Sequence, residues 1–71
     1  MNNQTKRYLE LAQQIQTEFT DIDGVNVWVN CYGDFVGVTF MSERGAQEAS
    51  YSYSYHEDAI NELKALAESL K

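Results

Sequence analysis

The most constraining feature of this sequence is the run Val-Asn-Val-Trp-Val-Asn-Cys-Tyr at residues 25–32. Small apolar residues alternate here with asparagine and aromatic residues, and a period of two is typical of a β-strand with two different faces. After Gly33 and Asp34, residues 35–41 again have the β-branched and aromatic composition of a strand. A two-residue loop that begins with glycine predicts a short antiparallel hairpin.

The position of the loop also predicts the register of this hairpin. If Gly33 and Asp34 form the loop, Tyr32 faces Phe35, and the numbers of paired residues sum to 67 along the ladder. We expect one face to form the core and the other to be at least partly exposed. The expected core face carries Val27, Val29, Cys31, Val36, Val38 and Phe40, and the outer face carries Asn26, Trp28, Asn30, Tyr32, Phe35, Gly37, Thr39 and Met41.

Two segments have the apolar spacing of amphipathic helices. Residues 3–19 place apolar side chains three and four positions apart, and the turn residues at 21–24 end this pattern. Ser54 and Glu57 form a capping box ahead of a second apolar stripe, which predicts a helix over residues 55–70. The stripes consist of Tyr8, Leu11, Ala12, Ile15 and Phe19 in the first helix, and Ala59, Ile60, Leu63, Leu66, Ala67 and Leu70 in the second.

A third strand is expected at residues 47–53, where serine alternates with tyrosine after the polar turn 42–45. If Tyr51 and Tyr53 lie on the side of Trp28 they enlarge the aromatic patch, and if they face the helices the serines complete the outer face. We favour the second arrangement, because serines facing the helices would bury hydroxyl groups and pack poorly. The predicted fold class is α+β, a two-layer α-β-β-β-α domain spanning residues 1–71. Both helices pack on one face of a three-stranded antiparallel meander. In so short a chain, burial barely exceeds the cost of ordering, so self-association would add useful stability.

Charge argues against nucleic-acid binding. The order of elements is similar to that of double-stranded-RNA-binding domains, which place lysines at the start of their last helix. This chain has His56, Glu57 and Asp58 there. The net charge is −6, and Arg44 is the only cation on or beside the expected strands. Neither phosphate contacts nor base stacking on the aromatic face is therefore expected, because both need a cationic groove.

The sequence shows no arrangement typical of an enzyme, a metal site or a cofactor site. Cys31 is the only thiol and is expected in the core, and His56 lies on a different element. Asp21 and Asp23 resemble the start of a calcium loop, but Val25 occupies the next ligand position. The four glycines are scattered and form no phosphate-binding loop. We therefore expect a non-enzymatic protein without metal or cofactor.

The remaining feature is the expected outer face, because two helices cannot cover both sides of a small sheet. Tryptophan, tyrosine and methionine are enriched at the centres of protein interfaces. We expect a small acidic interaction module, an inhibitor or adaptor that docks on a protein with a neutral or basic surface. The candidate partner-binding residues are Trp28, Tyr32, Phe35 and Met41 on the outer face, together with Asp34, Glu57 and Asp58.

Two further hypotheses concern the partner and the setting. In size and charge, the chain is similar to small inhibitors of restriction or CRISPR systems from phages and mobile elements. Those inhibitors present acidic side chains that mimic the charge of nucleic acid. Alternatively, the chain forms a structural homodimer through its aromatic face. A single cysteine and the lack of a long apolar run predict a cytoplasmic protein that does not enter membranes.

Overall fold

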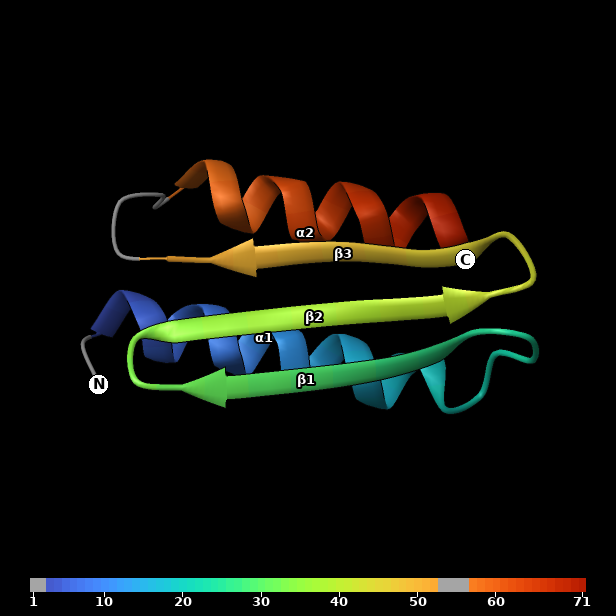
Figure 1. The fold of residues 1–71 in the computed structure, drawn as a ribbon, viewed down its shortest axis with the longest axis horizontal. Helices are drawn as coiled ribbons and strands as arrows, with labels where there is room; N and C mark the ends of the chain where they lie inside the picture. The colour runs from blue at the N-terminus through green and yellow to red at the C-terminus, as the bar shows by residue number, and fades with distance from the viewer. Residues whose placement is uncertain (1–2, 53–56) are drawn as a thin grey trace.

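The computed structural model describes residues 3–52 and 57–71, which form one layer of helices and one β-sheet. The order along the chain is α1 (Asn3–Phe19), β1 (Asn26–Tyr32), β2 (Phe35–Ser42), β3 (Gly45–Tyr51) and α2 (Glu57–Leu70). The sheet is an antiparallel meander with β2 in the middle, and both helices lie behind the same face (Figure 1). The predicted α+β class and element order are confirmed.

The hairpin register is confirmed over its whole length. Tyr32 pairs with Phe35, Val29 with Val38, and Asn26 with Met41, as a loop at Gly33 and Asp34 requires. Gly33 has a φ of 59°, a left-handed conformation that glycine adopts without a steric penalty. β1 is one residue shorter than expected, at 26–32 instead of 25–32. β2 is one residue longer, at 35–42 instead of 35–41.

The third strand begins and ends two residues earlier than predicted, at 45–51 instead of 47–53. Ser42 already pairs with Gly45, so only Glu43 and Arg44 form the turn. Gly45 accommodates this tight connection with a φ of 102°. Tyr51 faces the helices and is buried, as expected. Tyr53, Ser54 and His56, and with them the predicted capping box, lie outside the described residues, and α2 is described from Glu57.

The core lies between the two helices and one face of the sheet. Phe40 of β2 packs edge-on against Phe19 of α1, with ring centroids 5.5 Å apart, and Tyr8 packs on Tyr51 at 5.4 Å. Thr5 joins the predicted stripe of α1 as a buried residue, whereas Leu11 is only partly buried. In α2 the residues Ala59, Ile60, Leu63 and Ala67 are buried, and Leu66 and Leu70 are partly buried.

The expectation that Cys31 is buried is wrong. Along the core side of β1, Val27 is buried, Val29 is partly buried and Cys31 is exposed. The reason is that α1 crosses the sheet obliquely: Tyr8 near its start contacts β3, and Gln16 near its end reaches the backbone of β1. Figure 1 shows α1 ending outside the free edge of β1. The helix therefore leaves the C-terminal end of β1 uncovered.

Candidate functional site

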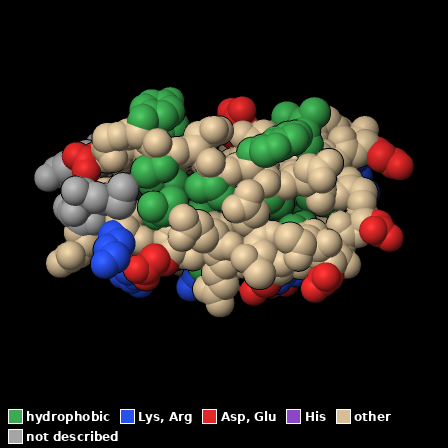
Figure 2. All heavy atoms as spheres, turned by 90° about the horizontal axis from the view of Figure 1, so that it is seen from below, with side chains coloured by type: hydrophobic (Ala, Val, Ile, Leu, Met, Phe, Trp, Pro, Cys, Tyr) green, Lys and Arg blue, Asp and Glu red, His purple; other side chains and the backbone are tan. Residues whose placement is uncertain are grey.

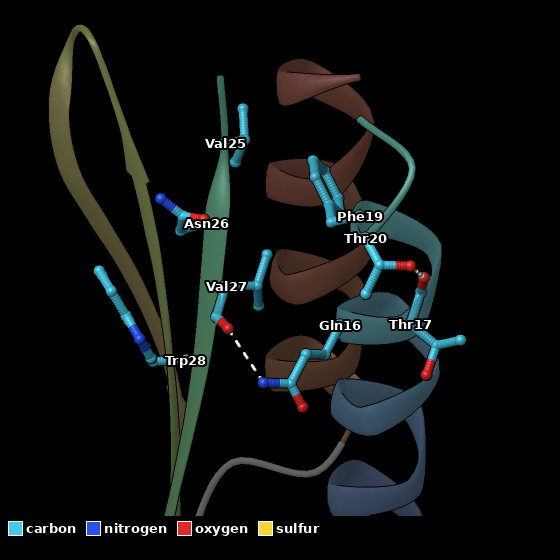
Figure 3. Close-up of a pocket in the computed structure, with 8 residues that line it drawn as sticks. All are labelled: Gln16, Thr17, Phe19, Thr20, Val25, Asn26, Val27 and Trp28. Atoms are coloured by element: carbon cyan, nitrogen blue, oxygen red, sulfur yellow. Dashed lines mark hydrogen bonds between the residues drawn. The ribbon is translucent and has the colours of Figure 1, made fainter. Parts of the chain in front are cut away.

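The face of the sheet opposite the helices carries a cluster of exposed apolar side chains. We call Trp28, Tyr32, Phe35 and Met41 the outer aromatic surface. Trp28 is 50% exposed, Tyr32 67% and Met41 38%, while Phe35 is partly buried. Figure 3 shows Trp28 pointing away from α1, on the opposite side of β1 from Val25 and Val27. The hairpin register thus brings together four of the predicted binding residues on a face that no described helix covers.

Tyr32 and Phe35 form a stacked pair beside the β1–β2 turn. Their ring centroids are 5.0 Å apart and the ring planes differ by 25°. The Phe35 ring lies over Gly37: a Cβ atom at Gly37 would be 3.1 Å from Phe35 Cε1. An added methyl group at Gly37 would be tighter than an ordinary contact, so the Phe35 ring would have to shift slightly. Gly37 thus leaves room for the Phe35 ring next to Tyr32.

A hollow of about 290 Å³ adjoins this pair on the outer face. Gly37 lies opposite Asn30 on one side and Ser50 on the other, and Thr39 lies opposite Glu48. Glu48 is the only charged residue lining the hollow, whose other walls are aromatic, neutral polar or backbone. The residues that line it are Asn30, Tyr32, Phe35, Gly37, Val38, Thr39, Glu48, Ala49 and Ser50. Such a concave centre with aromatic walls and neutral hydrogen-bonding groups suits a protruding side chain of a partner.

The acidic members of the predicted site do not lie together. Asp34 is in the β1–β2 turn, next to Tyr32 and Phe35. Glu57 and Asp58 form the first turn of α2, in the helical layer. There Glu57 Oε1 is 3.1 Å from Arg7 Nη1, and both side chains are largely exposed. The structure therefore separates Glu57 and Asp58 from the outer aromatic surface.

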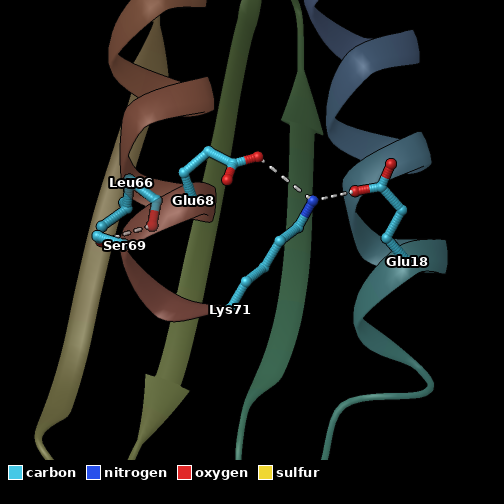
Figure 4. Close-up of polar contacts among 5 residues, drawn as sticks. All are labelled: Glu18, Leu66, Glu68, Ser69 and Lys71. Carbon is cyan, nitrogen blue, oxygen red and sulfur yellow. Dashed lines mark hydrogen bonds and ion pairs between the residues drawn. The ribbon is translucent and has the colours of Figure 1, made fainter.

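Lys71 joins the far ends of the two helices. Its Nζ atom is 2.9 Å from Glu18 Oε2 of α1 and 3.6 Å from Glu68 Oε1 of α2 (Figure 4). The hydrogen bond to Glu18 is the main reason that the pKa of Lys71 lies above its usual value. Acidic side chains in the helical layer are thus partly neutralised. Asp23 and Glu43 line a separate hollow at this end of the molecule, together with Arg44 and Lys71.

The described residues contain no cluster of side chains that could hold a metal ion. No group of three histidine, cysteine, aspartate or glutamate side chains in ranges 3–52 and 57–71 is placed to hold a metal ion. Asp21 and Asp23 belong to the turn after α1, which Gly24 completes with a φ of 87°. Burial, reinforced by Glu62, raises the pKa of Tyr8 to about 12. That phenol therefore stays protonated at neutral pH.

A second feature, which the sequence-based interpretation missed, lies at the free edge of β1. Gln16 Nε2 donates a hydrogen bond to the carbonyl oxygen of Val27 at 3.0 Å (Figure 3). Beside this contact, α1 and β1 enclose a hollow of about 320 Å³ whose lining residues carry no charge. These are Gln16, Thr17, Phe19, Thr20, Val25, Asn26, Val27 and Trp28. The lack of charged residues at 25–32 was visible in the sequence and indicated an uncharged surface. The order of strands was needed to show that this segment lies at an edge of the sheet.

In the part of the chain that the structure describes, no helix combines the length and apolar character needed to cross a lipid bilayer. No protein-family model, no curated protein and no solved structure matches this chain.

Proposed function

We propose that this protein is a non-enzymatic interaction module that docks on a partner protein through the outer aromatic surface. The observation that carries the proposal is the exposure of Trp28, Tyr32 and Met41 on one face of a well-packed sheet. Exposing such side chains to water is unfavourable, and soluble domains seldom gather them on one face without a use. Binding would remove this surface from water and would act as inhibition or as adaptation of the partner.

The chemistry of the surface indicates the kind of partner. Aromatic walls around the Gly37 hollow fit an aliphatic or aromatic side chain that protrudes from the partner. Around this apolar centre stand Asp34 and Glu48, and the chain as a whole carries a net charge of −6. A neutral or basic rim on the partner would therefore meet opposite charge and associate faster.

A more specific version of the proposal is an inhibitor of a nucleic-acid-processing defence system, encoded by a phage or mobile element. In that version carboxylates take the place of phosphate groups on a basic partner surface. Its support is the small size, the net charge of −6 and the acidic residues at the edges of the sheet, Asp34 at one end and Asp23 and Glu43 at the other. The exposed thiol of Cys31 also favours a reducing compartment such as the cytoplasm.

Site-specific photo-crosslinking in cells tests the docking face directly. A photoreactive residue is placed at Thr39, in the centre of the outer face, and in a matched variant at Glu62, which is exposed on α2. We expect a discrete adduct from position 39, none from position 62, and loss of the adduct when Trp28→Ala is added. An adduct from position 62 alone would overturn the proposal.

Binding measurements with the partner identified in this way distinguish apolar docking from charge mimicry. Trp28→Ala and Tyr32→Ala are each expected to weaken binding by about thirtyfold, the effect of removing a central aromatic anchor. The acidic variant Asp23→Asn with Glu43→Gln serves as the matched test of charge. If only this variant weakens binding, and the loss disappears at high salt, the carboxylates rather than the aromatic side chains form the interface.

A further inference from the structure

The free edge of β1 lacks the features that normally prevent strand edges from pairing. β1 is an outer strand of the sheet, and its sequence contains no charged residue and no proline. Its pairing with β2 contains no bulge. Natural edge strands are commonly protected by lysine, proline, a bulge or a covering segment. The opposite edge, β3, carries Glu48 and is flanked by Arg44. At Val27 the side chain of Gln16 occupies the outward carbonyl oxygen. The stretch of β1 from Trp28 to Tyr32 is thus the unprotected part of this edge.

The hairpin geometry defines which backbone groups of β1 face outward. Tyr32 and Phe35 flank a two-residue loop, so they form a hydrogen-bonded pair, and the residues that bond to β2 are Tyr32, Asn30, Trp28 and Asn26. The N–H and C=O groups of Val27, Val29 and Cys31 therefore point away from β2. The hydrogen bond from Gln16 to the Val27 carbonyl confirms this direction. Among the described residues, no bond is recorded for the outward groups of Val29 and Cys31.

We propose that two copies of this chain pair antiparallel through their β1 edges, with Asn30 of one copy opposite Asn30 of the other. In this register Val29 of each copy faces Cys31 of the other, and each such pair forms two backbone hydrogen bonds. The pairing uses the outward groups that α1 leaves open. Gly33 of the other copy lies opposite Val27 but belongs to the turn beyond β1, so no strand bond there competes with the bond between Gln16 and Val27. It joins the two sheets into one and sets the two outer aromatic surfaces side by side.

The neighbouring registers are less favourable. Placing Val29 opposite Val29 brings Cys31 opposite Val27, whose carbonyl oxygen Gln16 already occupies. Placing Cys31 opposite Cys31 brings Val29 opposite Gly33, which lies beyond the end of β1 in a left-handed turn. Only the register centred on Asn30 pairs the free groups of both Val29 and Cys31.

The side chains in this register are complementary on both faces of the joined sheet. On the outer face Trp28 of one copy lies opposite Tyr32 of the other, so that two exposed aromatic side chains pair across the strands. On the helical face, the partly buried Val29 lies opposite the exposed Cys31. Figure 2 views the molecule from its β1 edge. Hydrophobic side chains lie in the middle of this view and along its upper rim.

The oblique position of α1 makes the two copies fit in shape. Each α1 ends outside the edge of its own β1 and leaves the Cys31 end of that strand uncovered (Figure 1). A two-fold axis at Asn30 brings the protruding end of one α1 next to the uncovered Cys31 of the other copy. The hairpin turn of one copy then enters the 320 Å³ hollow beside Val27 and Trp28 of the other. The lining of that hollow contains no charged side chain that would repel Asp34.

Light scattering on variants of the exposed outer face of β1 tests the interface. The native chain is expected to have twice the mass of one chain, and high salt is expected to strengthen the dimer by screening two charges of −6. Asn30→Lys places two like charges opposite each other on the axis and should raise the dimer dissociation constant by roughly tenfold or more. The matched variant Asn26→Lys makes the same charge change near Asp34 of the other copy and should leave the dimer intact.

Disulfide trapping tests the register without relying on the stability of a charged variant. In a Cys31→Ser background, Asn30→Cys places two thiols in a non-hydrogen-bonded pair, where Cα atoms are about 4.5 Å apart and a disulfide fits. Oxidation should link the Asn30→Cys chains and should not link Asn26→Cys chains in the same background.

Several outcomes would overturn the edge dimer. These are a native chain that stays monomeric at millimolar concentration, a dimer equally sensitive to Asn26→Lys and Asn30→Lys, and efficient crosslinking through native Cys31. A dimer that dissociates with Trp28→Ala but resists Asn30→Lys would place self-association on the outer face instead. The outer aromatic surface of a single chain is exposed without the edge pairing, so failure of the edge dimer would not affect the proposed docking of a partner there.

Discussion

The two faces of the sheet are built from adjacent residues of the same strands, but one face is buried and the other is exposed to solvent. Phe40 is fully buried against Phe19, whereas Met41, the next residue of β2, is 38% exposed. The difference does not follow from hydrophobicity, because the outer face also carries Trp28, Tyr32 and Phe35. It follows from where the described helices lie, since both cover one face and neither covers the other. Apolar character on an uncovered face is therefore available for binding.

Truncation of Phe40 is the strongest test of the difference between the faces. Phe40→Ala leaves a cavity under α1 and removes the edge-on contact with Phe19. We expect a loss of about 3–5 kcal/mol in the free energy of unfolding, enough to unfold much of so small a domain. Urea denaturation followed by circular dichroism measures it. A loss under 1 kcal/mol would mean that this face is not the core.

The stability of the protein at high pH tests the burial of Tyr8, which lies in the same core as Phe40. The pKa of Tyr8 is raised from 10.0 to about 12 in the folded state, and its buried hydroxyl has no hydrogen-bond partner among the described residues. Above pH 10 the unfolded chain loses this proton while the folded chain keeps it. Stability should therefore be fully present below pH 10 and fall by about 1 kcal/mol per unit up to pH 12.

The control for this pH effect is Tyr8→Phe, which removes the titrating hydroxyl and keeps the ring. Denaturation curves of the two proteins between pH 9 and pH 12 should diverge as the pH rises. Parallel curves would show that the Tyr8 hydroxyl is accessible to water in the folded protein.

Truncation of Met41 is the matched change on the outer face and should have the smallest effect. Met41→Ala removes a partly exposed side chain one residue away from Phe40. We expect the free energy of unfolding to change by about 0.5 kcal/mol or less, the usual range for surface positions. The measurement is again urea denaturation, at a low protein concentration. A loss comparable to that of Phe40→Ala would show that a second layer covers the outer face.

Much of this architecture was predictable because the relevant signals are local. The period of two in β1 and the glycine of a two-residue loop predict the pairing of Val29 with Val38 and the face of every side chain in the hairpin. The apolar spacing of α1 predicts its limits at Asn3 and Phe19. The start of β3 was less predictable, because a tight turn at Glu43 and Arg44 and a longer polar loop have similar sequences.

The candidate sites were predictable only in part. Alternation correctly places Trp28 and Tyr32 on the outer face, and it also places Cys31 on the helical side. It contains no information on how far a helix extends over a strand, and for this reason the expected burial of Cys31 was wrong. Glu57 and Asp58 were included in the predicted binding site because they are acidic. The layer in which they lie depends on how α2 packs.

The sequence by itself determined which residues form each helix and strand, how β1 pairs with β2, and which side chains share a face. These properties depend on backbone geometry and on neighbours a few residues apart, and the order of residues records both directly. Only the tertiary structure decided that α1 crosses the sheet obliquely, that Gln16 reaches Val27, and that the end of β1 at Cys31 is uncovered. These properties depend on how side chains of distant segments fit together, which no local pattern specifies.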